Sequence, residues 1–266
     1  MLKGIDSKNV LVTGAAQGIG FAVAKRFAEE GASVFIVDRV ETAQMTAALE
    51  KIRSVAKSGK ALIAGHRADI SNEAAVDEAF KAAVAALGQI DILINNAGIN
   101  RGYPSDQFRV EDFDQVLNVN LRAVFIFSQH AIRHFLERKI PGVIVNNSSN
   151  HESQPKPGFI AYSVSKGGLG NLTKTLALEF ADRGIRINSV APGAVVTPLN
   201  KSWTDDPQKR ANVESHIPVG RAATAEEIAG VFAFLASEDA AYITGQTIYA
   251  DGGLTLSADY RKNWAS

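Results

Sequence analysis

Cysteine is absent from this chain of 266 residues. Without a thiol, the protein has no disulfide, no thiolate nucleophile and no cysteine-ligated zinc site. An excess of charge of one sign is also lacking, because 28 Lys and Arg residues balance 28 Asp and Glu residues. A neutral balance argues against a surface for nucleic acid or an anionic membrane. Nothing in the sequence indicates a bound metal ion.

Long apolar runs are missing too, and none could cross a bilayer. Residues 1–6 lack the apolar core of a signal peptide. We therefore expect a cytoplasmic protein with no membrane partner. Hydrophobic residues make up 46% and charged residues 21%, an ordinary globular composition.

Short apolar runs typical of strands alternate with stretches of helical periodicity. The predicted strands are 9–13, 33–38, 61–64, 90–94, 142–145, 185–190 and 247–250. The predicted helices include 19–30, 73–87, 111–138, 160–183 and 225–236. This alternation is typical of a parallel sheet covered on both faces. We expect a single α/β domain over residues 1–266, a doubly wound Rossmann-type parallel sheet.

A glycine-rich turn, residues 13–20, follows the first strand and opens the first helix. Glycine lets the backbone approach a pyrophosphate, whose charge is favoured by a helix N-terminus. Asp38 ends the second strand, 18 residues beyond Gly20, where a ribose-binding carboxylate is expected. Because that carboxylate would repel a 2′-phosphate, the sequence favours NAD over NADP. Arg39 leaves NADP open, since it could bind the phosphate if Asp38 swung aside.

Tyr162 and Lys166 are four residues apart, on one face of a predicted helix. A nearby cation favours the phenolate, so we expect Lys166 to lower the pKa of Tyr162 towards the range useful for acid–base catalysis. The same spacing is common on solvated helix faces, and a tyrosine can also be a core aromatic. The pair therefore needs support from the rest of the chain.

Several further segments carry a resemblance to a known family. Besides residues 13–20, they are Asn95–Gly98, Asn118–Leu121, Asn146–Ser149 and the Tyr162–Lys166 motif. Over essentially its whole length, the chain resembles the short-chain dehydrogenase/reductase family. The resemblance implies hydride transfer between an alcohol and a nicotinamide cofactor.

The resemblance also implies four catalytic residues. Ser149, with Ser148 as the alternative, would bind the reacting oxygen, and Tyr162 would take its proton. Lys166 would lower the pKa of the tyrosine and hold the nicotinamide ribose. Asn120 would position a water that links Lys166 to solvent. The implied cofactor contacts are Gly14, Gln17, Gly18, Ile19, Gly20, Asp38, Arg39, Asp69, Ile70, Asn96, Ala97, Gly98, Tyr162, Lys166, Pro192, Gly193, Val195 and Thr197.

A narrower similarity concerns the substrate. Residues 148–152, 206–215, 217–220 and 249–253 resemble segments of bacterial glucose 1-dehydrogenases, which oxidise an aldose at its anomeric carbon to a lactone. A sugar needs several polar side chains around it. The candidate substrate contacts are Asn100, Arg101, Ser149, Asn150, His151, Glu152, Tyr162 and Asn200.

Three alternatives remain open. Arg101, Lys156 or Lys201 could bind a carboxylate, phosphate or sulfonate on a modified sugar. A carbonyl reductase for 3-oxoacyl, ketone or steroid substrates would instead have a more apolar pocket. A regulator that only binds the cofactor would lack one of the catalytic residues, and all of them are present.

Residues 197–221 interrupt the alternation of strands and helices, and we expect them to form a lid over the substrate. The C-terminal residues Tyr260 and Trp264 are aromatics that we expect to be buried against another subunit. Together with the family resemblance, they favour a homotetramer.

Overall fold

A single sheet of seven parallel strands, in the order β3-β2-β1-β4-β5-β6-β7, organises the protein. The computed structural model describes residues 2–57 and 59–256. The strands are β1 (Asn9–Thr13), β2 (Ser33–Asp38), β3 (Ile63–Arg67), β4 (Ile92–Asn95), β5 (Gly142–Asn147), β6 (Ile185–Pro192) and β7 (Thr247–Ala250). Strands β1, β4 and β5 are almost wholly buried, as expected when helices cover both faces.

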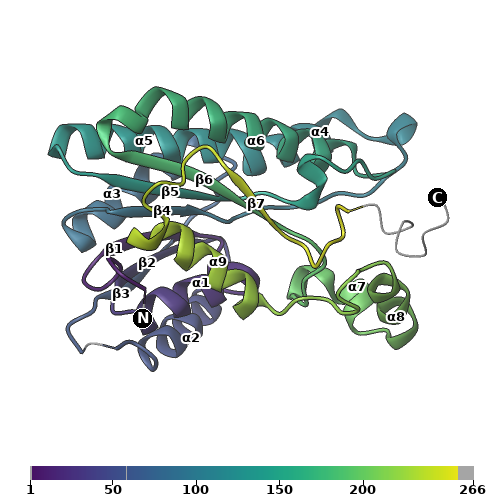
Figure 1. Ribbon diagram of the computed structural model, residues 1–266, viewed down its shortest axis with the longest axis horizontal. Coiled ribbons are helices and arrows are strands. Elements are labelled where there is room, and N and C mark those ends of the chain that lie inside the picture. The colour runs from purple at the N-terminus through teal and green to yellow at the C-terminus, as the bar shows by residue number, and fades with distance from the viewer. Residues whose placement is uncertain (1, 58, 257–266) are drawn as a thin grey trace.

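Helices cover the two faces of the sheet in separate layers (Figure 1). One layer contains α1 (Gly18–Glu29), α2 (Thr42–Arg53) and α9 (Ala225–Ala236). The other contains α3 (Glu73–Leu87), α4 (Val110–Leu117), α5 (Ala123–Arg138) and α6 (Ile160–Phe180). Two short helices, α7 (Lys201–Thr204) and α8 (Pro207–Ser215), project beyond the sheet. Each layer has its own apolar core against its face of the sheet.

The expected doubly wound sheet is confirmed, with shifted boundaries. The strand predicted at 61–64 lies at Ile63–Arg67. The helix predicted over 111–138 is interrupted by a π-helical turn, Asn118–Arg122. Helix α2 was not predicted, although Met45, Ala48 and Ile52 supply its buried face at helical spacing.

The strand order reverses between β1, which continues towards β2 and β3, and β4, which continues towards β5. In open α/β sheets, ligands bind at such a switch point, beyond the carboxyl ends of the strands. No helix in the described part of the chain is long and apolar enough to span a membrane. Tyr260 and Trp264 lie outside the described residues.

Candidate active site

A cavity of about 910 Å³ lies at the carboxyl ends of the strands around the switch point. Most of the predicted cofactor residues line it. They are Gly14, Gln17, Gly18, Ile19, Asp38, Arg39, Asp69, Ile70, Asn96, Ala97, Gly98, Tyr162, Lys166, Pro192, Gly193, Val195 and Thr197. Gly20 is predicted to contact the cofactor but does not line the cavity; it is buried in the first turn of α1.

The glycine turn between β1 and α1 requires glycine for two reasons. Gly14 has φ +64, and a Cβ there would lie 2.6 Å from the Cα of Ala97. A Cβ on Gly20 would lie 2.2 Å from the carbonyl oxygen of Gly14 and 2.3 Å from Nδ2 of Asn96. The tight packing brings the N-terminus of α1 to the cavity, where its free N–H groups favour an anion.

Asn96 holds this turn in place from the end of β4. Its Nδ2 donates to the carbonyl oxygens of Thr13, at 3.0 Å, and Gly14, at 2.8 Å. Its Oδ1 accepts from Nδ2 of Asn147, at 2.9 Å, at the end of β5. These bonds tie three neighbouring strand ends together and fix the floor of the cavity.

Two carboxylates line the end of the cavity near β2 and β3. Asp38 accepts from the backbone N–H of Ala16, at 2.9 Å, and of Arg39, at 2.8 Å. Asp69 accepts from the N–H of Ser71, and that bond chiefly lowers the pKa of Asp69. Arg39 is exposed beside them. A ribose or adenine would meet hydrogen-bond acceptors at this end of the cavity.

Lys166 places a buried ammonium group at the other end of the cavity. Only 3% of the residue is exposed, and its Nζ donates to the carbonyl oxygen of Asn147 at 2.6 Å. Burial lowers the pKa of Lys166 to about 8, and the charge of Glu152 acts in the opposite direction.

Tyr162 lies one turn from Lys166 on α6, and the Lys166 ammonium lies 5.5 Å from the centre of the tyrosine ring. Burial raises the pKa of Tyr162, and a hydrogen bond with the Ser149 side chain partly offsets that effect. The net shift of the Tyr162 pKa in the protein alone is thus upwards, opposite to the expected lowering. The physical reason is that desolvation of the phenolate outweighs the favourable contacts. The phenol is neutral at neutral pH.

Ser149 and Asn120 occupy buried, hydrogen-bonded positions. The Ser149 hydroxyl donates to Oδ1 of Asn150, at 3.2 Å, and accepts from the N–H of His151, at 3.1 Å. Asn120 lies in the π-helical turn, where its Nδ2 donates to the carbonyl oxygen of Ile99 at 2.9 Å. Such turns are frequent at functional sites. A role for Asn120 in positioning a water stays a prediction.

The predicted substrate residues divide into two groups. Asn100, Asn150, His151 and Asn200 line the cavity together with Ser149 and Tyr162, which are also predicted to be catalytic. Arg101 and Glu152 do not line it.

Local pairing explains both departures. Arg101 turns towards helix α4, where it lies 3.9 Å from Asp112 and 3.3 Å from the side chain of Gln115. Glu152 turns towards the sheet and accepts a hydrogen bond from the hydroxyl of Ser148 at 2.6 Å. The sequence could not show either orientation, because both depend on which neighbour each side chain meets.

Aromatic and amide groups that were not among the predicted contacts also line the cavity. The Phe159 ring is tilted against His151, with ring centres 5.9 Å apart, and His151 meets Tyr162 edge-on at 6.0 Å. Trp203 adds a ring from α7. Asn147 could have been found from its place at the carboxyl end of a strand next to the switch point. Trp203 lies in the segment 197–221 that was expected to cover the substrate, whereas the position of Phe159 carried no such signal.

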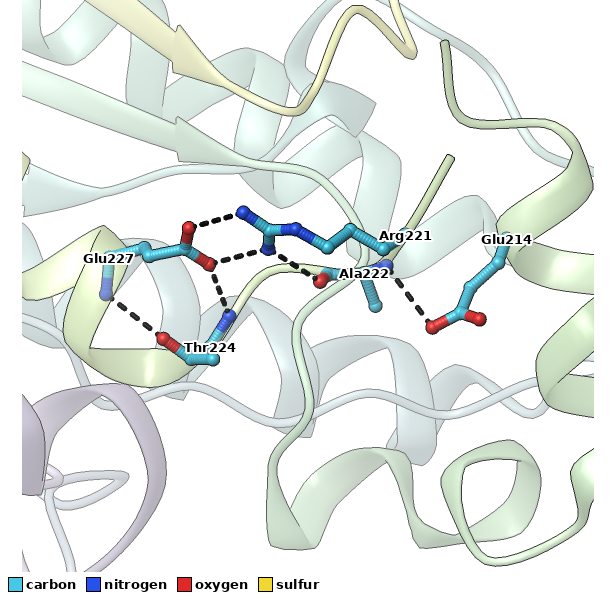
Figure 2. A network of polar contacts seen from close by, with 5 residues as sticks. All are labelled: Glu214, Arg221, Ala222, Thr224 and Glu227. Carbon is cyan, nitrogen blue, oxygen red and sulfur yellow. Dashed lines mark hydrogen bonds and ion pairs between the residues drawn. The ribbon is translucent and has the colours of Figure 1, made fainter. Parts of the chain in front are cut away.

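Residues 197–221 form one wall of the cavity, and their two ends are joined. Val196 and Ala223 are joined by an N–H···O bond of 2.9 Å, beside a bridge between Val195 and Ala223. Figure 2 shows the polar network that fixes the second end. Closure of this segment over a substrate stays a prediction.

In that network, Arg221 binds both carboxylate oxygens of Glu227, at 2.6 and 2.8 Å. Glu227 also completes a capping box with Thr224 at the start of α9. The pKa of Glu227 is lowered to about 2, chiefly by Arg221, so the ion pair persists through the neutral and mildly acidic range. Glu214 of α8 accepts a hydrogen bond from the N–H of Ala222 at 3.3 Å. This bond connects α8 to the same polar network.

The cavity fits a dinucleotide by its shape and its donor set. Gly14 and Gly20 leave room for a close backbone approach, and the helix N-terminus suits a pyrophosphate. Oδ1 of Asn100 and Oδ1 of Asn147 are buried, and no donor among the described residues reaches them. Buried acceptors of this kind need a partner. No group of three His, Asp or Glu side chains in the described ranges is placed to hold a metal ion.

Comparison with known proteins agrees with this geometry. The family described as Enoyl-(Acyl carrier protein) reductase matches residues 14–255. Glucose 1-dehydrogenase of Gluconobacter oxydans is 49% identical over 97% of this chain and 96% of its own. 3beta-hydroxysteroid dehydrogenase 1 of Eggerthella lenta is 46% identical over 96% and 97% of the two chains.

The crystal structure of 3-ketoacyl-(acyl-carrier-protein) reductase from Brucella melitensis complexed with NADH has a TM-score of 0.85 and 36% identity. It covers 95% of this chain and 100% of that one. Similar proteins thus act on CH–OH groups or the corresponding carbonyls with a nicotinamide dinucleotide. The chain belongs to the short-chain dehydrogenase/reductase family.

Proposed function

We propose that the protein oxidises an aldose at its anomeric carbon, giving a lactone, with NAD as the hydride acceptor. The observation that carries this proposal is the polar lining beside Tyr162. Oδ1 of Asn100 is buried and has no donor among the described residues, and Asn150 and His151 line the same cavity. Sugar hydroxyls can donate to such acceptors, whereas an apolar skeleton cannot. The 49% identity to a glucose 1-dehydrogenase supports the same substrate class.

In the proposed reaction, the substrate hydroxyl lies between the side chains of Ser149 and Tyr162, both of which line the cavity. The bound nicotinamide accepts the hydride. Tyr162 takes the hydroxyl proton, and Lys166 favours the phenolate that must exist before that transfer. Because the pKa of Tyr162 is raised in the protein alone, the phenol also suits donation of a proton in the reverse direction.

The preference for NAD rests on Asp38. Its carboxylate is held beside the glycine turn by the N–H groups of Ala16 and Arg39. In that place it can accept from ribose hydroxyls and would repel a 2′-phosphate. The exposed Arg39 next to it could bind that phosphate once the repulsion is removed.

We predict that Asp38→Asn lowers the ratio of kcat/KM for NAD over NADP by at least roughly tenfold, the effect of about 1.4 kcal/mol of lost repulsion. Steady-state kinetics with both cofactors measures the ratio. Asp69→Asn is the matched control, since it removes a carboxylate from the same end of the cavity and should leave the ratio within about threefold. A wild-type preference for NADP would contradict the proposal.

An anionic sugar is the second candidate substrate, and Lys156 is the observation that favours it. Its ammonium lies 4.2 Å from the centre of the Phe159 ring and lines the cavity, whereas neither Arg101 nor Lys201 does. Lys156 is thus the one of the three suggested cations that can meet a substrate in the described structure.

Reduction of NAD in the presence of neutral aldoses, sugar 6-phosphates and 6-sulfonates, uronic acids, alditols and 3β-hydroxysteroids separates the candidates. We expect aldoses to be oxidised. If anionic sugars are preferred, Lys156→Gln should lower their kcat/KM by roughly tenfold and leave neutral aldoses unchanged. Activity confined to hydroxysteroids or 3-hydroxyacyl thioesters would overturn the sugar assignment.

We further propose that the protein is a homotetramer. A groove of about 550 Å³ between α6 and residues 117–125 is lined in part by Leu121, Phe125 and Leu172, and Phe125 is exposed. Exposed apolar patches of this kind mark interfaces. Sedimentation velocity should give a mass about four times that of the 28.4 kDa chain, and a monomer would contradict the proposal.

A further inference from the structure

Glu152 follows the catalytic serine closely in sequence, yet its carboxylate faces the protein interior. Oε2 accepts from the hydroxyl of Ser148 at 2.6 Å, and Oε1 accepts from the hydroxyl of Thr247 at 3.0 Å. Ser148 follows β5 and Thr247 begins β7, so the carboxylate connects two strands of the sheet. A carboxylate held in this way is a structural partner of the protein and not a ligand for the substrate.

Helix α6 makes room for this carboxylate. A Cβ on Gly170 would lie 2.4 Å from both Cδ and Oε1 of Glu152, and a Cβ on Gly167 would lie 3.8 Å from its carbonyl oxygen. Gly170 is one helical turn beyond Lys166. The negative charge is therefore placed directly against the helix that carries Tyr162 and Lys166.

The other groups described around the Lys166 ammonium carry no negative charge that would offset the cost of its burial. Its hydrogen-bond partner, the carbonyl oxygen of Asn147, is uncharged, and the neighbouring Tyr162 phenol is neutral at neutral pH. The side chain of Asn120, on the π-helical turn, is uncharged as well. The carboxylate of Glu152 is the negative charge that acts on Lys166, and it opposes the effect of burial.

We propose that Glu152 is a positioning residue of the active site: its half-buried carboxylate, packed against α6 one turn beyond Lys166, is the counter-charge of the Lys166 ammonium. Through Ser148 and Gly170, it also fixes the serine segment against α6. The proposal rests on the dehydrogenase chemistry of the family and does not depend on which alcohol is the substrate.

The test measures the charge of Lys166 directly in the full chain, without cofactor or substrate. Lysine labelled with ¹³C at the ε position gives one NMR signal per residue, and Lys166→Arg identifies the signal of Lys166. In the wild type its midpoint should lie at about 8. Glu152→Gln keeps the shape of the side chain but removes the charge, and should lower the midpoint by roughly one pH unit.

Thr247→Val is the matched control. It removes one hydrogen bond to Glu152 and leaves the carboxylate charged, so both variants lose a similar structural contact. Melting temperatures should fall in both, while the Lys166 midpoint should move only in Glu152→Gln. A midpoint unchanged in Glu152→Gln, or shifted equally in Thr247→Val, overturns the proposal.

A second readout follows catalysis with any alcohol that the enzyme oxidises. In Glu152→Gln, the alkaline limb of the kcat/KM profile should move to lower pH by about the shift seen in the NMR titration.

If Glu152→Gln does not fold, Glu152→Asp is the second variant. It moves the carboxylate back by one methylene group and should lower the Lys166 midpoint by a smaller amount. A midpoint at or above the wild-type value in Glu152→Asp contradicts the proposal. Failure of the sugar assignment would leave the NMR result intact, so the two proposals fail separately.

Discussion

The buried ammonium group of Lys166 is the constraint on which the arrangement of the surrounding active-site residues depends. A cation shielded from water is costly unless acceptors and a counter-charge stand close to it. The carbonyl oxygen of Asn147 accepts a hydrogen bond from the ammonium, and Glu152, whose carboxylate packs against Gly170 of α6, supplies a negative charge. Asn147 ends β5 and Glu152 lies in the turn that follows it, so the end of this strand brings the required groups together.

The end of β5 also links the two halves of the site. Asn147 contacts Lys166 through its carbonyl and Asn96 through its side chain, and Asn96 in turn holds the glycine turn. The groups expected to perform chemistry and those expected to hold the dinucleotide are thus joined by a short chain of hydrogen bonds. A rigid link of this kind keeps reacting groups aligned, which is the protein's main contribution to hydride transfer.

Local sequence patterns predicted the sheet, the glycine turn and the Tyr162–Lys166 pair, because each depends on neighbouring residues along the chain. The orientation of Glu152 could not be predicted, since it depends on Thr247, 95 residues away. The orientation of Arg101 could not be predicted for the same reason. Its guanidinium lies beside Asp112 and Gln115 and not in the cavity. The direction of the Tyr162 pKa shift could not be predicted either. It depends on the burial of the side chain, which the spacing of Tyr162 and Lys166 does not reveal.

The acid–base behaviour of Tyr162 is the central claim, and its titration in the cofactor-free protein tests that claim most directly. The phenolate absorbance of the wild type, minus that of Tyr162→Phe, isolates the ionisation of this one side chain. Because burial outweighs the Ser149 hydrogen bond, we predict a midpoint above 10.0. A midpoint of about 7, the range of an efficient general base, would contradict the claim, since Lys166 alone would then suffice to form the phenolate.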